Sequence, residues 1–140
     1  MRTIQQLAVV LGAAYLAVGV LGFAWTGVTD WLASEGATMI IFEINPFHNL
    51  VHILIGAMWL LGARAQQPGV AAGTFLGIGG AYLAATILGF IGALPILAID
   101  AGLAPDNFLH LVTALVAVGA AVTLGDWSSE ETSPEVGSGV

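Results

Sequence analysis

The sequence has very few charged residues. They make up 8% of its 140 positions, whereas 58% are hydrophobic, and a soluble domain carries about a quarter charged residues. Positive charge is scarcest: Arg2 and Arg64 face nine carboxylates, no lysine is present, and the net charge is −7. A chain of this composition cannot cover a water-facing surface. Because contacts to phosphates need cations, the sequence also argues against a nucleic-acid partner.

Cysteine is absent. This excludes disulfides, thiolate metal sites, haem attachment through thioethers and cysteine nucleophiles. Nor does any serine or threonine stand beside a histidine and a carboxylate, as an activated hydroxyl nucleophile would require. The sequence therefore leans towards a protein without catalysis but leaves the question open.

Long apolar runs dominate what is present. A helix that crosses a bilayer core of about 30 Å needs about 20 apolar residues. Four such runs lie at about Leu7–Trp25, Phe47–Ala65, Val70–Leu94 and Asn107–Leu124. We predict an all-α integral membrane protein, a four-transmembrane-helix bundle within residues 1–126. Residues 127–140 are rich in Ser, Glu, Pro and Gly and are expected to form a disordered acidic tail.

The two arginines predict the topology. Arg2 precedes the first run and Arg64 lies in the short second link, while the two longer connections carry only acids. By the positive-inside rule, both termini are expected in the cytoplasm, and the protein in the lipid bilayer of a prokaryotic cell membrane. The four tryptophans, Trp59 among them, are expected near the membrane boundaries. The apolar stretch Met39–Phe42 has three open readings: a helix extension, an interfacial segment or a short strand.

An internal repeat organises the chain. Gly12–Phe23 (GAAYLAVGVLGF) and Gly79–Phe90 (GGAYLAATILGF) are identical at eight of twelve positions, and HNLVH at 48–52 aligns with DNFLH at 106–110. This indicates a tandem duplication of a two-helix unit, with repeat one at about 7–65 and repeat two at about 70–124. Two units with an even number of spans enter the membrane the same way. A pseudo-twofold axis along the membrane normal is therefore expected.

Glycines are frequent in the first and third runs. Gly73 and Gly77 form a GxxxG pattern, and Gly12, Gly19 and Gly22 recur at near-helical spacing. Small residues allow helices to pack closely in lipid. We expect these glycines to form packing seams within the bundle. The alternative is that they form an interface in a homo-oligomer or a larger membrane complex.

All three histidines lie in the two matched motifs. Residues four apart share a helix face, so His48/His52 and Asp106/His110 form two such pairs about 10 Å or less from the outer surface. If the twofold axis brings them together, they supply a ligand set for a transition metal such as zinc, copper or iron. His52 and His110 on facing helices are alternatively how a bundle holds a haem.

A structural interpretation stands beside these two. Buried polar groups in a bilayer need partners, and Asn49, Asn107, Tyr15 and Tyr82 provide them in both halves. The first functional hypothesis is thus a small membrane module or accessory subunit with an intramembrane His/Asn polar cluster near the outer face. The second is a metal- or haem-binding membrane protein used in sensing, electron transfer or metal handling.

The same residues carry a family resemblance. A Gly/Ala-rich first helix with Tyr and LGF, then NPFHNLVH at 45–52 and DNFLH at 106–110, resembles the bacterial membrane family catalogued as domain of unknown function 4383. The resemblance covers about Leu7 to Leu124. It implies a four-helix membrane protein and brings no reaction with it.

Overall fold

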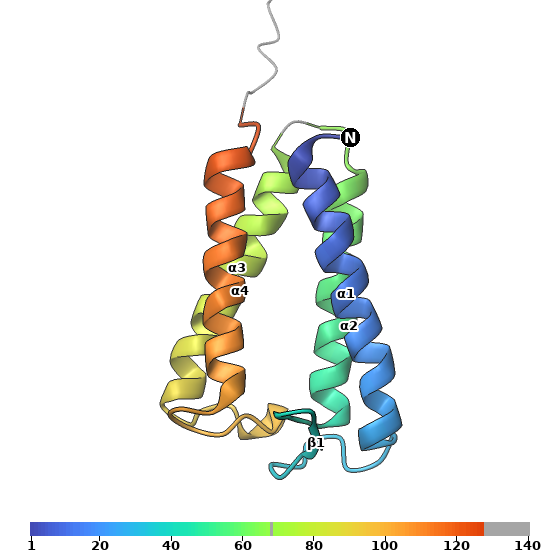
Figure 1. Cartoon of the computed structure of the whole chain (residues 1–140), viewed down its shortest axis with the longest axis vertical. Coiled ribbons are helices and arrows are strands. Elements are labelled where there is room, and N and C mark those ends of the chain that lie inside the picture. The colour runs from blue at the N-terminus through green and yellow to red at the C-terminus, as the bar shows by residue number, and fades with distance from the viewer. Residues whose placement is uncertain (68, 128–140) are drawn as a thin grey trace, which may run out of the picture.

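A computed structural model describes residues 1–67 and 69–127 (Figure 1). Within them the elements are α1 (Thr3–Thr26), β1 (Ala37–Met39), β2 (Phe42–Ile44), α2 (Pro46–Arg64), α3 (Val70–Phe90), the 3-10 helix η1 (Pro95–Leu97) and α4 (Pro105–Leu124). Each α-helix is long and apolar enough to cross a membrane, so the expected all-helical membrane architecture is confirmed. The acidic tail expected at 127–140 lies outside the described residues from 128 onward.

The helix ends differ from the expected ones by a few residues. Helix α1 begins at Thr3 rather than Leu7, because the Arg2 backbone N–H donates to Oε1 of Gln5 at 2.9 Å and closes the first turn. Helix α3 ends at Phe90, and Gly92 then takes a left-handed φ of 73°. This conformation suits glycine, which has no Cβ, and it turns the chain out of the helix.

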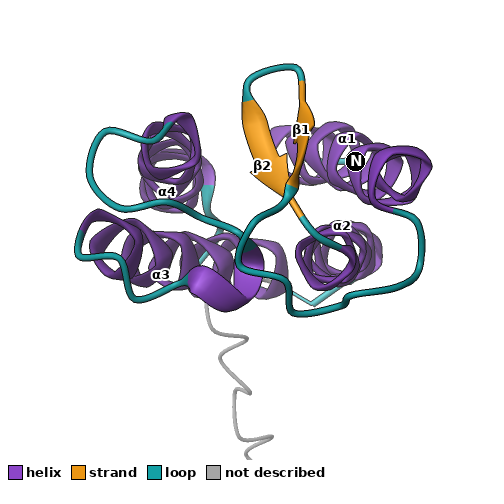
Figure 2. Cartoon of the chain, turned by 90° about the horizontal axis from the view of Figure 1, so that it is seen from below, coloured by secondary structure: helices purple, strands orange, loops and turns teal. Residues whose placement is uncertain are grey.

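The four helices form two pairs. α1 packs along α2 and α3 along α4, and the pairs lie side by side so that α2 neighbours α3 and α1 neighbours α4 (Figure 2). Close approach within the first pair depends on glycine. A Cβ added at Gly12 would lie 2.9 Å from the Gly56 carbonyl oxygen, and one at Gly56 would lie 2.8 Å from the Gly12 oxygen. The expected packing seam is thus present in α1.

The GxxxG pattern of α3 is different, and the expectation of a seam there is wrong. A Cβ added at Gly73 or Gly77 would meet nothing within 4 Å. Both glycines are exposed on the surface of α3, so they face away from the bundle.

We call the end of the bundle that holds residue 1 the terminal end and the opposite end the hairpin end. The apolar core lies mostly towards the terminal end, where Trp59 and Phe75 are fully buried and their rings lie 5.8 Å apart. Trp59 was expected near a membrane boundary, and its ring is 0% exposed. It packs against Phe75 of α3 inside the bundle, so the ring itself does not meet lipid or water.

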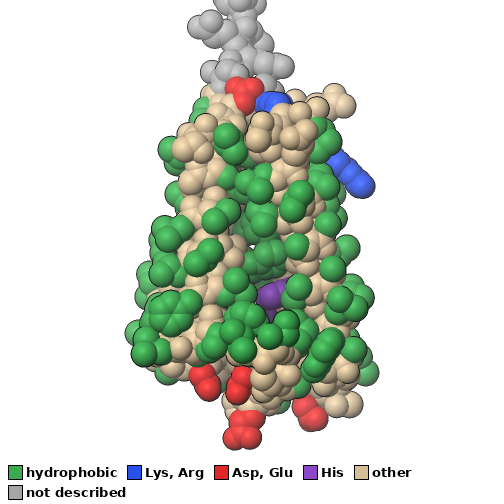
Figure 3. Space-filling view, in the orientation of Figure 1, with side chains coloured by type: hydrophobic (Ala, Val, Ile, Leu, Met, Phe, Trp, Pro, Cys, Tyr) green, Lys and Arg blue, Asp and Glu red, His purple; other side chains and the backbone are tan. Residues whose placement is uncertain are grey.

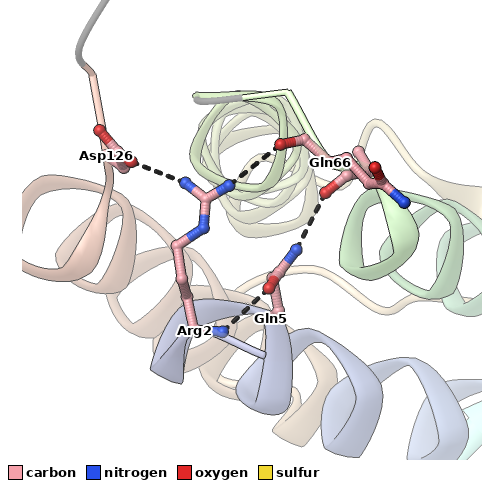
Figure 4. Close-up of polar contacts among 5 residues, drawn as sticks. Arg2, Gln5, Gln66 and Asp126 are labelled. Atoms are coloured by element: carbon pink, nitrogen blue, oxygen red, sulfur yellow. Dashed lines mark hydrogen bonds and ion pairs between the residues drawn. The ribbon is translucent and has the colours of Figure 1, made fainter.

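Polar contacts tie the terminal end together (Figure 4). Nη1 of Arg2 lies 2.8 Å from Oδ2 of Asp126, and Nη2 donates to the Gln66 carbonyl at 3.3 Å. Nε2 of Gln5 donates to the Ala65 carbonyl at 2.9 Å. The start of α1, the second link and the segment after α4 are therefore held at one place.

The hairpin end carries the two longer connections. The Met39–Phe42 stretch, left undecided by the sequence, forms the turn of an antiparallel hairpin in which Met39 pairs with Phe42. Strand β1 contacts α1 and β2 contacts α4, and the hairpin lies over the space between these two helices (Figure 2). It therefore links the two helix pairs.

Candidate functional site

The three histidines meet between the two helix pairs, towards the hairpin end. The ring centroids of His48 and His52 on α2 lie 4.7 Å apart, and that of His110 on α4 lies 6.2 Å from His48. His48 is 3% exposed and His110 is 4% exposed, while His52 is half-buried. We call these three side chains the histidine cluster. The spacing of four along α2 brings His48 and His52 together, and His110 reaches them from α4, diagonally across the bundle (Figure 2).

Two tyrosines complete the cluster on its core side. The Tyr15 ring lies 5.1 Å from His52, and the Tyr82 ring lies 5.2 Å from His110. The two tyrosine rings are themselves 5.8 Å apart, edge to face. Five aromatic rings from all four helices therefore surround one point in the bundle.

Polar atoms of the cluster are incompletely paired. Among the described residues, Nδ1 of His48 and Nδ1 of His110 are buried without a hydrogen-bond partner. A neutral imidazole has one N–H donor and one acceptor nitrogen, and leaving one unsatisfied in an apolar interior costs about 1–3 kcal/mol. Each such buried polar group calls for an explanation, and a ligand that satisfies it is one.

Two cavities flank the histidine cluster on opposite sides. The smaller, about 120 Å³, lies between α2 and α3, and the larger, about 350 Å³, lies between α1 and α4 under the hairpin. His48, His52 and His110 line both of them. Figure 3 shows histidine (purple) at the bottom of a hollow in one face of the molecule.

Asp106 holds the hairpin in place. It lies in the first turn of α4, where a carboxylate is favoured by the helix dipole, and its Oδ2 accepts from the Glu43 backbone N–H at 3.4 Å. The side chain is 4% exposed and also lines the larger cavity. One carboxylate thus joins α4 to β2 at the rim of the histidine cluster.

The predicted metal set consists of His48, His52, Asp106 and His110. Within residues 1–67 and 69–127, no group of three or more His, Asp or Glu side chains is arranged to hold a metal ion. The rings of His48 and His52 meet edge to face, at an interplanar angle of 76°. The described residues therefore offer no ready metal site.

Asn49 and Asn107 lie apart from the imidazoles in their hydrogen bonding. Nδ2 of Asn49 donates to Oγ1 of Thr26 at 2.9 Å. Nδ2 of Asn107 donates to the carbonyls of Asp100 and Gly102 at 3.0 and 2.9 Å. The Asn49 amide therefore fastens the end of α1 to α2, and the Asn107 amide fastens the loop that precedes α4 to that helix.

Each asparagine packs on a glycine of the neighbouring helix. A Cβ added at Gly22 would overlap Oδ1 of Asn49, and one at Gly89 would overlap Oδ1 of Asn107. The same contact therefore occurs at matched positions of the two helix pairs.

Two residues important to the site were not singled out from the sequence. Oδ1 of Asn45 accepts from the His48 backbone N–H at 2.8 Å and caps α2, while its Nδ2 donates to the carbonyls of Ala33 and Ile96, each at 2.9 Å. Asn directly before Pro46 is a helix-start signal that could have identified it. Thr113 shares a 2.9 Å hydrogen bond with the Tyr15 hydroxyl across the two pairs. No local pattern marks that contact.

Comparison with curated proteins and with solved structures gives no match. A protein-family model does match, over residues 5–123, and this range includes all four helices almost completely. The chain therefore belongs to the family described as a domain of unknown function (DUF4383).

Proposed function

We propose that the chain is a non-catalytic membrane module that binds a small ligand at the histidine cluster. The observation that carries this is the pair of buried, unpartnered Nδ1 atoms on His48 and His110 beside two cavities. Polar groups are expensive inside a bilayer and usually have a partner or a function there. Nδ2 of Asn49 and Nδ2 of Asn107 already donate to other groups, so these asparagines fit a structural role, although Oδ1 of Asn107 is itself buried without a partner among the described residues.

The module is proposed to consist of two repeats related by a pseudo-twofold axis along the membrane normal. Equal ring distances support this, since Tyr15 lies 5.1 Å from His52 and Tyr82 lies 5.2 Å from His110. The matched glycine–asparagine contacts within each pair support it too. The histidine cluster would then lie close to the axis, with one cavity on each side of it.

A metal or haem is the second candidate. The unpartnered nitrogens on facing helices favour it, because imidazole nitrogens are metal ligands once deprotonated. His52 and His110 would hold a haem, and His48 with Asp106 would join them around a metal ion. A rearrangement of the side chains would be needed for the metal ion, since the described residues offer no ready group.

We also propose that both termini are cytoplasmic in a prokaryotic plasma membrane, which places the histidine cluster towards the outer face. Arg2 and Arg64 lie at the terminal end and only carboxylates at the other (Figure 3), which is the charge bias of the positive-inside rule. The exposed glycines of α3 support assembly with a second copy or within a larger complex.

Native mass spectrometry of the detergent-purified chain tests ligand binding. We expect an adduct mass on the wild type and none on His48→Phe/His110→Phe, which keeps aromatic volume but removes the nitrogens. Elemental analysis and a visible spectrum of the same preparation identify a metal or a haem. An unliganded wild type, with the double variant changed only in stability, would favour a purely structural cluster and reject the proposal.

A further inference from the structure

The larger cavity opens sideways rather than along the bundle axis. Its walls are apolar side chains of α1 and α4, among them Ala14, Val18 and Leu109. Val18 is 37% exposed and Leu109 is 39% exposed, and both belong to membrane-spanning helices. The mouth of the cavity therefore faces lipid.

The hairpin covers the cavity at the hairpin end. Met39, Phe42 and Ile44 line the side of the cavity that faces the hairpin, and Ile40 at the turn is 83% exposed. An apolar hairpin tip of this kind separates the cavity from water beyond the membrane. A ligand would therefore come from the bilayer, between α1 and α4.

The floor of the cavity offers donors and flat rings. His48, His52 and His110 line it together with Tyr15. A buried neutral imidazole can donate one N–H, and no described residue accepts from or donates to Nδ1 of His48 or His110. A ligand with a carbonyl oxygen on a planar ring would satisfy a donor and stack on the aromatic side chains.

The charges around the larger cavity argue against an anionic ligand. Both arginines belong to the terminal end of the bundle, and the charged side chain that lines the cavity is Asp106. An anionic head group would meet this carboxylate with no cation to offset it. A cationic head group could still pair with Asp106, because a carboxylate has acceptor sites beyond the one on Oδ2 that Glu43 uses, and a lipophilic cation is therefore an arm of the test.

We propose that the larger cavity binds the ring of a neutral, membrane-soluble quinone, with its lipid tail extending between α1 and α4. This inference rests on the proposed ligand-binding function and names its ligand class. At about 350 Å³ the cavity lies within the usual range for small-molecule sites, about 300–1,000 Å³.

Fluorescence quenching by a short-tailed benzoquinone tests the proposal. Trp59 is a suitable reporter, because its ring lies 5.0 Å from Tyr15 at the cavity. The other tryptophans, Trp25, Trp31 and Trp127, are replaced by Phe in every protein compared. Ala14→Phe fills the larger cavity, and Ala81→Phe, at the matched position of the repeat, fills the smaller one.

We expect saturable quenching in the reference protein and in Ala81→Phe, and only non-saturable quenching in Ala14→Phe. His48→Phe and His110→Phe should each bind about tenfold more weakly, as the loss of one buried hydrogen bond implies. If Ala14→Phe does not fold, Val18→Phe provides the same block from the next turn of α1.

Three results would overturn the inference. Equal, non-saturable quenching in all variants would mean partition into the micelle alone. Loss of binding in Ala81→Phe but not in Ala14→Phe would place the ligand in the smaller cavity. Tighter binding of a fatty-acid anion or a lipophilic cation would reject the neutral class, yet leave ligand binding at the histidine cluster standing. If native mass spectrometry finds an adduct but no quinone binds, the quinone inference fails while ligand binding at the histidine cluster stands.

Discussion

At the scale of single residues, the glycine–asparagine contacts carry much of the packing within each helix pair. Asn49 and Asn107 are 2% and 0% exposed, and each amide occupies the space that a glycine leaves on the neighbouring helix. The amide then reaches past the glycine to the end of that helix or to the loop beyond it. The missing Cβ of the glycine and the buried amide of the asparagine thus together hold the two helices of each pair close.

Gly22→Ala and Gly89→Ala should each destabilise the protein. The added methyl group overlaps Oδ1 of the facing asparagine, and overpacking of this kind costs about 1–3 kcal/mol. The measurement is the free energy of unfolding in mixed micelles. Gly73→Ala is the matched control, because a Cβ there meets nothing, and it should be neutral or gain up to about 1 kcal/mol from helix propensity. Equal effects at Gly22 and Gly73 would contradict the overlap.

At the scale of elements, the start of α2 is fixed by a single side chain. Asn45 is 1% exposed and joins the α2 backbone to the carbonyls of two separate connections, at Ala33 after α1 and at Ile96 in η1. Because His48 lies one turn into the same helix, the position of this helix start sets the position of the histidine cluster along the bundle axis. Pro46 at the first helical position adds a φ already suited to the helix.

Replacement of Asn45 separates the cap from the loop contacts. Asn45→Ala should cost about 0.5–2 kcal/mol for the cap and a further 1–3 kcal/mol for each carbonyl left unpaired. Asn45→Ser keeps a capping oxygen but is too short to reach both carbonyls, so it should recover only the cap. Thermal unfolding followed by helical circular dichroism measures both. An Asn45→Ser protein as stable as wild type would mean that the loop carbonyls contribute nothing.

At the scale of the whole molecule, the two ends of the bundle differ in chemistry. The terminal end holds both arginines and the Arg2–Asp126 ion pair, which is half-exposed and of modest energy. The hairpin end holds Glu43, Asp100 and Asp106. Such asymmetry bears on orientation in the membrane more than on the stability of the bundle.

Reporter fusions test the orientation. Fusions after residue 140 should report the cytoplasm, and fusions within Thr26–Gly36 should report the opposite side. The reason is that Arg2 and Arg64 keep the terminal end of the bundle in the cytoplasm. Arg2→Gln/Arg64→Gln with two lysines added in the Thr26–Gly36 connection should raise the inverted fraction. A periplasmic signal from the wild-type C-terminal fusion would reverse the orientation and place the histidine cluster near the inner face.

The exposed face of α3 gives a separate test of assembly. Gly77→Ile should weaken any homo-oligomer measured by cross-linking in detergent, because close helix approach in lipid depends on small residues. It should leave the monomer fold intact, since nothing lies near a Cβ at Gly77. Gly119→Ile, on an equally open position of α4, is the control. The same cross-linking yield in both variants would argue against assembly through α3.

The sequence by itself determined the membrane architecture, and for a simple reason. Inside a bilayer the backbone must satisfy its own hydrogen bonds, so four long apolar runs with few charges lead directly to four spanning helices. Local signals also place helix starts well, as Asn45-Pro46 does for α2. The histidines at 48 and 52 could be assigned to one helix face from spacing alone.

Only the tertiary structure decided how those faces meet. The rotation of each helix depends on contacts between distant residues, such as Gly12 against Gly56, and no local pattern encodes it. This rotation buries Trp59, turns Gly73 outward, and separates the asparagines within each pair from the histidines between the pairs. Because an i,i+3 or i,i+4 spacing fixes only relative directions on one helix, the two cavities beside the histidine cluster could not be foreseen from the sequence.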